Sequence, residues 1–317
     1  MSKFSFVYRA EEPTVIAVWL LTLEVITTLL RIIFELVRGI YLSFVPPAPK
    51  DVSGEIILIT GAGHGMGREV AIRFAKLGAT IVCVDINKEG NQETVDLIKE
   101  AKGTAHRFEA DVTDRDAVFK LAQRVTIEVG DVTILVNNAG IMPCKPLLRW
   151  SEQEVRSTMD INVNGNIWMI QAFLPTMLER NYGHIVAMSS MAGMMPVPNL
   201  VPYCGSKFAV RAIMDTLALE LQSQPRDASG LKFTTICPFV VNTGLCHRPK
   251  SRFPALIKTV ETADAADKIV DAVRREIREI SIPGDLHYLV RYFMWLVPFP
   301  VVKIVNSFID AGVNPHD

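Results

Sequence analysis

The sequence has no C-x-x-C motif and no pair of histidines at the spacing of metal ligands. Its five cysteines, Cys83, Cys144, Cys204, Cys237 and Cys246, are odd in number. These absences argue against a zinc site and against a disulfide framework. We therefore expect no metal, and we expect reduced, mostly buried thiols in a domain that faces a reducing compartment.

An excess of either charge is also missing. The 33 Lys and Arg residues nearly balance the 34 Asp and Glu residues, for a net charge of −1. This balance gives no electrostatic reason to expect a nucleic-acid partner. There is no internal repeat and no low-complexity tract, so the 317 residues suit one large domain or a domain with appendages.

Hydrophobic residues are abundant, at 49% of the chain, and one group of them lies near the N-terminus. Thr14–Leu30 carries a single charge, Glu24, and the apolar character continues to Val45. At about 100° per residue, the few polar side chains of 14–44 fall in one narrow stripe. A helix over these residues is about 46 Å long, which exceeds the hydrocarbon thickness of a bilayer.

We expect this segment to associate with a membrane, and two interpretations fit it equally. It either spans the bilayer, ending near Arg31, or lies in the interface with its polar stripe towards water. Pro46–Pro49 then reads as a stiff linker, which places a domain boundary at residue 50.

A glycine-rich turn follows the linker. Glu55–Thr60 is a short apolar run typical of a buried parallel strand, and a helical pattern covers Arg68–Leu77. Between them lie Gly61, Gly63, Gly65 and Gly67. A turn of this kind between a strand and a helix lets the backbone approach a pyrophosphate, which then faces the N–H groups of the helix.

Asp85 ends the next predicted strand, eighteen residues after Gly67. A carboxylate there accepts hydrogen bonds from the hydroxyls of an adenosine ribose and repels a 2′-phosphate. The sequence therefore favours NAD(H), with NADP(H) as the less favoured cofactor.

Strands and helices alternate along the rest of the domain. The expected strands are 105–110, 133–136, 184–188 and 233–237, and the expected helices are 114–129, 150–180 and 203–221. This alternation predicts an α/β fold, a doubly wound parallel sheet of Rossmann type. Ligands bind such a sheet at the carboxyl ends of its strands, where Asp111 and Asn137 also fall.

Three groups suited to proton transfer follow the strand that ends at Met188. They are the hydroxyl of Ser190, the phenol of Tyr203 and the ammonium of Lys207, four residues after Tyr203. If Tyr203 opens a helix, Lys207 lies one turn along on the same face. A cation there stabilises a phenolate, so that the tyrosine can exchange a proton with a substrate oxygen.

In this order and spacing, the motifs resemble those of the short-chain dehydrogenase/reductase family over residues 54–284. The resemblance is carried by Thr60, Gly61, Gly65, Gly67, Asp111, Asn137–Gly140, Asn162, Ser190, Tyr203, Lys207 and Pro238–Thr243. It implies Tyr203 as general acid/base, Ser190 as the holder of the substrate oxygen, and Lys207 as the residue that tunes Tyr203 and binds the nicotinamide ribose. Asn162, rather than Asn164, resembles the residue that anchors a proton-relay water.

The resemblance also completes the expected cofactor site. That site comprises Gly61, Gly65, Met66, Gly67, Asp85, Asp111, Val112, Asn138, Ala139, Gly140, Tyr203, Lys207, Val241 and Thr243. One residue departs from the family pattern: Phe239 stands where a glycine usually follows the proline. This departure puts the usual backbone contact to the carboxamide in question.

Four stretches resemble a membrane-associated branch of the family, the epidermal retinol dehydrogenases and 17β-hydroxysteroid dehydrogenases of types 11 and 13. They are Gly54–Gly67, Asp85–Gly90, Gly130–Gly140 and Cys237–Gly244. The resemblance implies a lipophilic alcohol as substrate, a location at the endoplasmic reticulum or on lipid droplets, a catalytic domain facing the cytosol, and a homodimer formed through the helices at 150–180 and 203–221. The apolar connection between Ser190 and Tyr203 fits a lipophilic substrate.

Residues 285–317 form an expected C-terminal hydrophobic segment. Aromatic side chains are dense in Leu286–Val297, and a second apolar run covers Val301–Ile309. Both suit a helix at a membrane interface, and equally a lid over the substrate cleft. The charged loop at 247–252 is expected to flank that cleft.

We therefore expect an NAD-preferring oxidoreductase of lipophilic alcohols or carbonyls. Two alternatives are a reductase of lipid biosynthesis, acting on fatty-acyl or sterol carbonyls, and a non-catalytic lipid-droplet protein that retains the fold.

Overall fold

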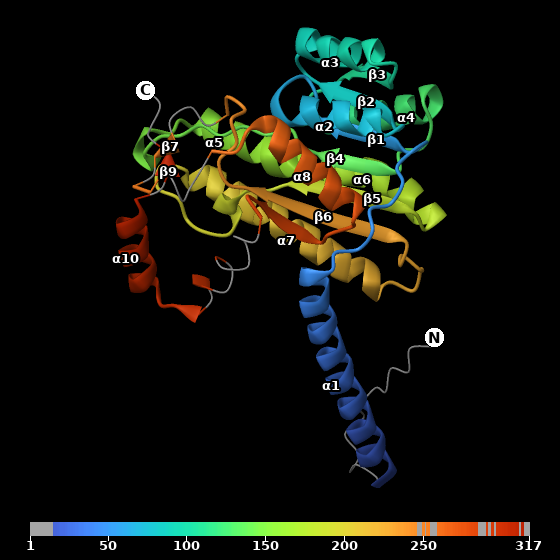
Figure 1. Ribbon diagram of the computed structural model, residues 1–317, viewed down its shortest axis with the longest axis vertical. Helices are drawn as coiled ribbons and strands as arrows, with labels where there is room; N and C mark the ends of the chain where they lie inside the picture. The colour runs from blue at the N-terminus through green and yellow to red at the C-terminus, as the bar shows by residue number, and fades with distance from the viewer. Residues whose placement is uncertain are drawn as a thin grey trace. The chain divides into compact units, whose positions relative to one another are not determined.

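The computed structural model describes residues 15–245, 249–250, 252–253, 259–284, 290, 293–294, 296–310 and 312–313. The chain divides into two compact units, Met1–Ala48 and Pro49–Asp317. The described part of the first unit is almost wholly one helix. The second unit contains a parallel sheet with helices on both faces (Figure 1).

Within the described residues, seven strands form one parallel sheet in the order β3-β2-β1-β4-β5-β6-β8. They are β1 (Ile56–Thr60), β2 (Thr80–Asp85), β3 (Thr104–Glu109), β4 (Ile134–Asn137), β5 (Gly183–Met188), β6 (Leu231–Pro238) and β8 (Glu279–Ile282). The predicted doubly wound sheet is confirmed. Because β1 pairs with both β2 and β4, the winding direction reverses beside β1, which is where such sheets bind ligands.

One face of the sheet is covered by α2 (Gly65–Lys76), α3 (Lys88–Glu100) and α8 (Thr262–Arg274). The helix side chains in this layer are mostly small or β-branched, among them Val70, Val95 and Ala265, and they pack on β1 and β2. Asn87 caps α3 by accepting a hydrogen bond from the backbone N–H of Gly90 at 2.9 Å.

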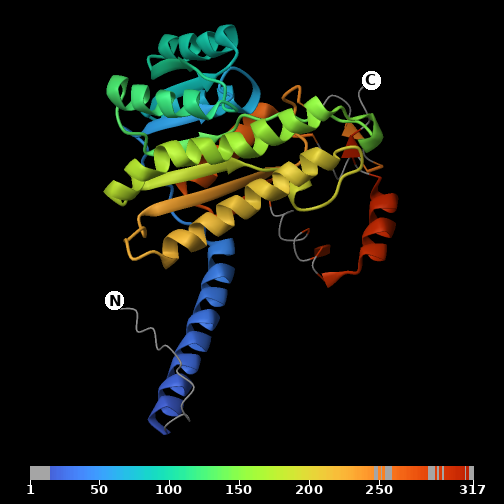
Figure 2. The same cartoon turned by 180° about the vertical axis from the view of Figure 1, so that it is seen from behind.

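The opposite face, seen in Figure 2, is covered by α4 (Arg115–Glu128), α6 (Gly165–Arg180) and α7 (Val201–Ser223). Larger side chains such as Met169, Phe173 and Met214 pack there against Leu135 and Ile185. Both faces of the central strands are therefore buried, which is why these strands read as unbroken apolar runs in the sequence.

The single helix expected over 150–180 is instead built from three pieces. They are α5 (Glu152–Met159), a π-helical turn η2 (Asp160–Asn164) and α6. A Ser151–Glu154 capping box starts α5. The π-helical turn covers Asp160–Asn164, so the 3.6-residue repeat of α5 does not continue in register into α6.

Helix α8 and strand β8 were not predicted from the sequence. β8 has four residues at the edge of the sheet and is only half buried, so it carries no apolar run of useful length. Two short segments, η1 (Leu147–Arg149) and η3 (Met191–Gly193), complete this part of the chain.

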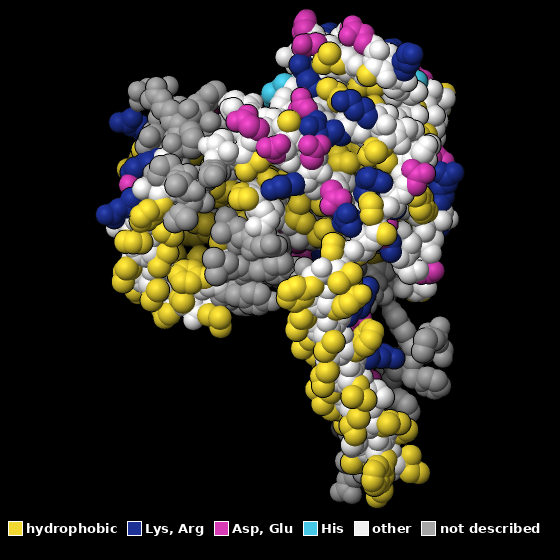
Figure 3. Space-filling model, viewed as in Figure 1, with side chains coloured by type: hydrophobic (Ala, Val, Ile, Leu, Met, Phe, Trp, Pro, Cys, Tyr) yellow, Lys and Arg dark blue, Asp and Glu magenta, His cyan; other side chains and the backbone are white. Residues whose placement is uncertain are grey.

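The first unit contains α1 (Val15–Phe44), whose side chains are exposed along its length. Among the described residues, α1 is the one helix long and apolar enough to cross a membrane, with a mean hydropathy of 2.0. Its apolar surface is visible in Figure 3. Arg38 and Glu35, in the predicted polar stripe, form an ion pair at 3.0 Å.

The C-terminal segment adds α10 (Phe299–Ile309) and the short strand β9 (Gly312–Val313), which pairs antiparallel with β7 (Pro249–Lys250). Several apolar side chains of α10, including Phe299 and Ile304, are exposed (Figure 3). Most of the expected helix at 286–297 lies outside the described residues, as do His247 and Arg248 of the charged loop. Lys250 of that loop forms an ion pair with Asp310.

Candidate active site

The loop between β1 and α2 is shaped by glycine. Gly61 and Gly65 have φ angles of +66° and +55°, a conformation that side chains with a Cβ rarely adopt. A Cβ on Gly67 would lie 2.1 Å from the carbonyl oxygen of Gly61. The backbone therefore turns more closely here than any other residue allows.

The start of α2 is open to an anion. His64 at its N-cap makes no capping hydrogen bond through its side chain, and the first turn carries no acidic residue. The N–H groups of that turn and the helix dipole then favour a negatively charged group. Met66, in the same turn, lines the pocket described below. This cradle fits the pyrophosphate of a dinucleotide.

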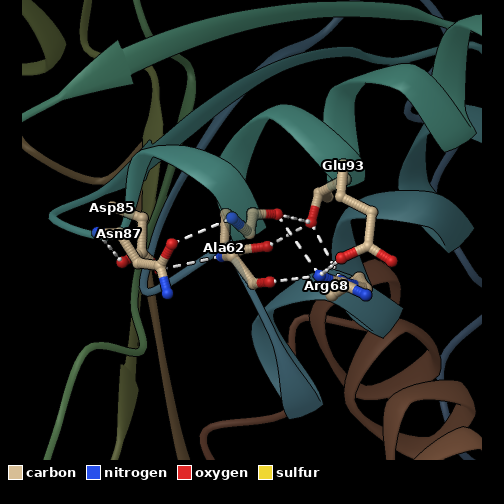
Figure 4. Close-up of polar contacts among 8 residues, drawn as sticks. Ala62, Arg68, Asp85, Asn87 and Glu93 are labelled. Carbon is tan, nitrogen blue, oxygen red and sulfur yellow. Dashed lines mark hydrogen bonds and ion pairs between the residues drawn. The ribbon is translucent and has the colours of Figure 1, made fainter.

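Asp85, at the end of β2, is buried and its two carboxylate oxygens face the backbone. One accepts the N–H of Gly63 and the other the N–H of Asn87, both at 2.8 Å. Figure 4 shows this carboxylate beside the glycine loop. Each oxygen keeps a further lone pair, so the predicted contact to ribose hydroxyls is chemically available.

The ends of β3 and β4 bring the next predicted residues to the same edge of the sheet. Asp111 accepts hydrogen bonds from the N–H and the hydroxyl of Thr113. Val112 packs against Gly165, the first residue of α6, where a Cβ would lie 2.9 Å from its side chain. Asp111 is thus an exposed carboxylate at the rim, and Val112 is a buried neighbour.

Asn138 and Ala139 tie the end of β4 to the glycine loop, while Gly140 lies beside Asn162 and Lys207. The N–H groups of Asn138 and Ala139 both donate to the hydroxyl of Thr60, each at 3.0 Å. The Asn138 amide donates to the carbonyls of Thr60 and Gly61. The two loops that flank the switch point are therefore held together by one hydroxyl and one amide.

Tyr203 and Lys207 lie on the buried face of α7, in its first two turns. The Lys207 ammonium is 5.7 Å from the centre of the Tyr203 ring and donates to the carbonyl of Met188 at 2.7 Å. Burial lowers the pKa of Lys207 to about 8 from its ordinary 10.5, while the Cys237 thiol acts in the opposite direction. The site thus holds a cation that is easily deprotonated beside a phenol.

Ser190 leaves β5 and lines the same pocket as Tyr203 and Lys207. Its hydroxyl donates to the carbonyl of Pro238 at 3.3 Å and accepts the N–H of Ala192 at 3.1 Å. The serine is held by these contacts at the carboxyl ends of β5 and β6. The structure therefore gathers Ser190, Tyr203 and Lys207 around one space.

Asn162 lies behind this group, fully buried in the π-helical turn. Its side chain exchanges two hydrogen bonds with the backbone of Ile141 and donates to the hydroxyl of Ser206 at 3.0 Å. Ser206 in turn donates to the carbonyl of Tyr203 at 2.7 Å. Asn164, the alternative residue, instead donates to Asp160.

The pocket in front of Ser190 is mostly apolar. Methionine and valine side chains from several segments line it: Met142, Met191, Met195, Val197, Val241 and Val313. Thr243 lines it too and lies against Gly65, where a Cβ would be 3.4 Å from the threonine Cβ. Phe239 contributes its side chain, while its N–H donates to the carbonyl of Ile282 at 2.8 Å. That amide is therefore engaged by the sheet.

Sequence reasoning did not find three contributors to this site: Ser206, Leu245 and the strand Gly312–Val313. Ser206 had a signal, since it lies between the two residues of the Tyr203–Lys207 pair. The C-terminal strand had none, because its position depends on pairing with β7 more than sixty residues earlier.

Comparisons with known proteins agree with this geometry. The family model of the short chain dehydrogenases matches residues 55–252. The chain is 38% identical over 269 residues to human 17-beta-hydroxysteroid dehydrogenase 13, covering 85% of this chain and 88% of that one. It is 38% identical over 259 residues to human epidermal retinol dehydrogenase 2, covering 81% and 83%.

Solved structures share the fold. A short chain dehydrogenase/reductase from Burkholderia phymatum, in complex with NAD, has a TM-score of 0.69 at 26% identity, covering 84% of this chain and 98% of that one. A metagenomic short-chain oxidoreductase in complex with NADP has a TM-score of 0.61 at 26% identity, covering 73% and 97%. Both carry nicotinamide dinucleotides, which the cradle described above fits. The chain belongs to the short-chain dehydrogenase/reductase family of alcohol-group oxidoreductases.

Proposed function

We propose that the protein interconverts a lipophilic alcohol and its carbonyl with NAD(H) as the preferred cofactor. The observation that carries the proposal is the position of Ser190, Tyr203 and Lys207 around one apolar pocket. The glycine cradle opens on the same edge of the sheet, so a dinucleotide held there lies within reach of that pocket. Residues 51–284 then form the catalytic domain.

A bound nicotinamide dinucleotide supplies the hydride acceptor or donor. The Tyr203 hydroxyl exchanges the proton of the substrate oxygen, and the Ser190 hydroxyl holds that oxygen by a hydrogen bond. Charged Lys207 stabilises the phenolate of Tyr203 in a buried site, where its field is weakly screened. Asn162 fixes the backbone of Ile141, and its proposed role is to anchor the water of a proton relay.

Dinucleotide binding is proposed for the remaining residues of the cofactor site. Gly61, Gly65, Met66 and Gly67 would hold the pyrophosphate, and Asp85 the adenosine ribose. The loops that end β3, β4 and β6 would enclose the rest through Asp111, Val112, Asn138, Ala139, Gly140, Val241 and Thr243. The preference for NAD follows from Asp85, because the carboxylate that two N–H groups hold at the end of β2 repels a 2′-phosphate.

The substrate class is inferred from the pocket and the relatives. Methionines and Phe239 offer an apolar and adaptable wall, which suits a bulky hydrocarbon skeleton. Relatives at 38–39% identity are named for retinol and for 17β-hydroxysteroids or estradiol. A retinol-type or 17β-hydroxysteroid-type alcohol is therefore the substrate proposed here.

We also propose that α1 anchors the protein in a membrane, at the endoplasmic reticulum or on lipid droplets. The catalytic domain would then face the cytosol, and it would pair with a second copy through α5, α6 and α7. The apolar length of α1 supports the membrane anchor. Deleting residues 1–45 should release the protein from the membrane fraction of cells. A truncated chain that still sediments with membranes would contradict α1 as the anchor.

The test of the activity uses the purified full chain in detergent or nanodiscs, with retinol and estradiol as substrates. Tyr203→Phe should abolish hydride transfer and leave NADH binding, measured by fluorescence, within about twofold of the wild type. Undiminished turnover by this variant would refute the proposed site. Faster turnover with NADP than with NAD would refute the cofactor preference.

Assays on the same purified protein distinguish two alternative functions. A reductase of lipid biosynthesis would reduce fatty-acyl or sterol carbonyls faster than it oxidises retinol or estradiol. A protein without catalysis would bind NADH yet turn over none of these compounds. Lipidomics of cells with and without the chain then identifies the natural substrate.

A further inference from the structure

The guanidinium of Arg68, in the first turn of α2, lies among four acceptors on two separate segments. Its Nε donates to the hydroxyl of Thr94 at 3.1 Å, and the two hydrogens of its Nη2 are shared among the carbonyls of Gly63 and Gly90, at 2.5 and 3.3 Å, and the Glu93 carboxylate, at 2.6 Å. In Figure 4, Arg68 and Glu93 lie on one side of the glycine loop and Asp85 on the other. One side chain thus links the loop to the first turns of α3.

Gly63 is the residue held from both sides. Its carbonyl accepts from Arg68, and its N–H donates to Asp85 at 2.8 Å. The preceding carbonyl, of Ala62, accepts from Thr94 at 2.8 Å, so one loop carbonyl is bonded from α2 and the other from α3. The carbonyls are directed away from Asp85, and the N–H of Gly63 is directed towards it.

Without Arg68, the carbonyl of Gly63 loses its charged partner and the hydroxyl of Thr94 loses the cation that orients it. A glycine peptide rotates easily, because no Cβ restricts it. The peptide that bonds Asp85 joins Ala62 to Gly63. Its N–H donates to Asp85, and its carbonyl accepts from Thr94, whose hydroxyl in turn accepts from Arg68. Rotation of this peptide would remove the N–H from Asp85 and turn the Ala62 carbonyl dipole towards the carboxylate. The ribose-binding carboxylate would then lose its position.

Glu93 completes the arrangement. The Arg68 side chain is 21% exposed while that of Glu93 is 62% exposed, so the carboxylate pairs with the cation from the solvent side. The pairing orients the guanidinium and balances its charge. A planar guanidinium reaches two carbonyls, a hydroxyl and a carboxylate together, which a lysine ammonium cannot match.

We propose that Arg68, oriented by Glu93, is a positioning residue for the adenosine end of the dinucleotide, acting on Asp85 through Thr94 and the Ala62–Gly63 peptide. The inference rests on the proposed dinucleotide binding. The variants should therefore change cofactor affinity and leave the chemical step unchanged, since the hydrogen-bond partners of Arg68 among the described residues do not include Ser190, Tyr203 or Lys207.

The test measures binding of ADP-ribose, which lacks the nicotinamide, by calorimetry on the purified full chain. Arg68→Ala should raise the Kd of ADP-ribose and the KM of NAD about tenfold, as expected for a lost charged hydrogen bond, and keep kcat within about twofold. Arg68→Lys should recover only part of that loss, and Glu93→Gln should raise the Kd about threefold. Arg124→Ala, which removes an exposed ion pair with Glu128 on α4, serves as the control and should change neither constant.

Three outcomes overturn the proposal. One is an ADP-ribose Kd within twofold of wild type in Arg68→Ala and Glu93→Gln. Another is a lowered melting temperature with that Kd unchanged, which marks a purely structural residue. The third is full recovery by Arg68→Lys. If the wild type itself binds neither ADP-ribose nor NADH, the proposed dinucleotide binding fails, and this inference fails with it.

Discussion

The Lys207 ammonium lies 5.7 Å from the centre of the Tyr203 ring, one turn along α7, and donates to the carbonyl of Met188 on β5. The helix and the strand therefore hold the cation in place from two directions. Because its ammonium donates to a carbonyl of β5, Lys207 cannot move away from the phenol without breaking a buried hydrogen bond. This relationship determines the first prediction.

Lys207 should make the stability of the protein depend on pH in a defined window. Its pKa is about 8 in the folded protein and 10.5 otherwise, so between these values the unfolded chain binds a proton that the folded chain does not. Unfolding free energy should therefore rise with pH across this window, because the penalty for burying the charge is present below pH 8 and is lost by 10.5.

The measurement compares wild type and Lys207→Met by urea unfolding between pH 7 and 10. The variant should lack the rise, and the difference between the two proteins should grow in favour of the wild type as pH increases. If the unfolding free energies of the two proteins changed in parallel with pH, the lysine would not be buried as described. Lys207→Met should also lower kcat by about a hundredfold or more, because it removes the charge that stabilises the phenolate.

Ser206→Ala should impair both folding and activity. The buried hydroxyl connects the carbonyl of Tyr203 to the amide of Asn162, so its loss leaves buried polar groups with fewer partners. We expect a loss of about 1–3 kcal/mol in unfolding free energy. The control is Ser223→Ala, which removes a similar bond to Glu220 at the exposed end of α7 and should cost much less. Equal losses in the two variants would argue against the buried link.

Gly67→Ala should abolish dinucleotide binding. The added Cβ would overlap the carbonyl of Gly61, so the loop has to open. Gly205→Ala is the matched control, since a Cβ there meets nothing within 4 Å and alanine favours a helix by about 1 kcal/mol. Fluorescence titration with NADH tests both variants. Retained NADH affinity in Gly67→Ala would contradict the cradle.

Phe239→Ala should alter substrate recognition and spare the cofactor. The ring lines the pocket with Met191, whereas the amide bonds to Ile282 and does not depend on the side chain. We expect the KM for estradiol or retinol to rise several-fold, while the KM for NAD stays within about twofold. Phe208→Ala, at an exposed position on α7, provides the control. A change confined to the KM for NAD would place Phe239 on the cofactor side instead.

Much of the architecture was predictable because its signals are local. Strands buried on both faces need continuous apolar runs, and a phosphate-binding turn needs glycines between a strand and a helix. The residues at the carboxyl ends of the strands, such as Asp85, Asn138 and Ser190, then lie at one edge of the sheet because all its strands are parallel. The cysteines also followed expectation where described, since Cys83, Cys144, Cys204 and Cys237 are buried and form no disulfide; Cys246 lies outside the described residues.

Tertiary structure decided the features that depend on contacts between distant segments. The π-helical turn that turns Asn162 towards Ser206, 44 residues later, leaves no trace in helical periodicity. The edge strand β8 was too short to be recognised, and Gly312–Val313 reaches the pocket only through its pairing with β7. The partners of Arg68 were equally hidden, because a surface arginine on a helix has many possible acceptors and only the packing of α2 against α3 selects among them. The sequence by itself determined which chemical groups stand at the strand ends, and the folded chain decided which of them meet.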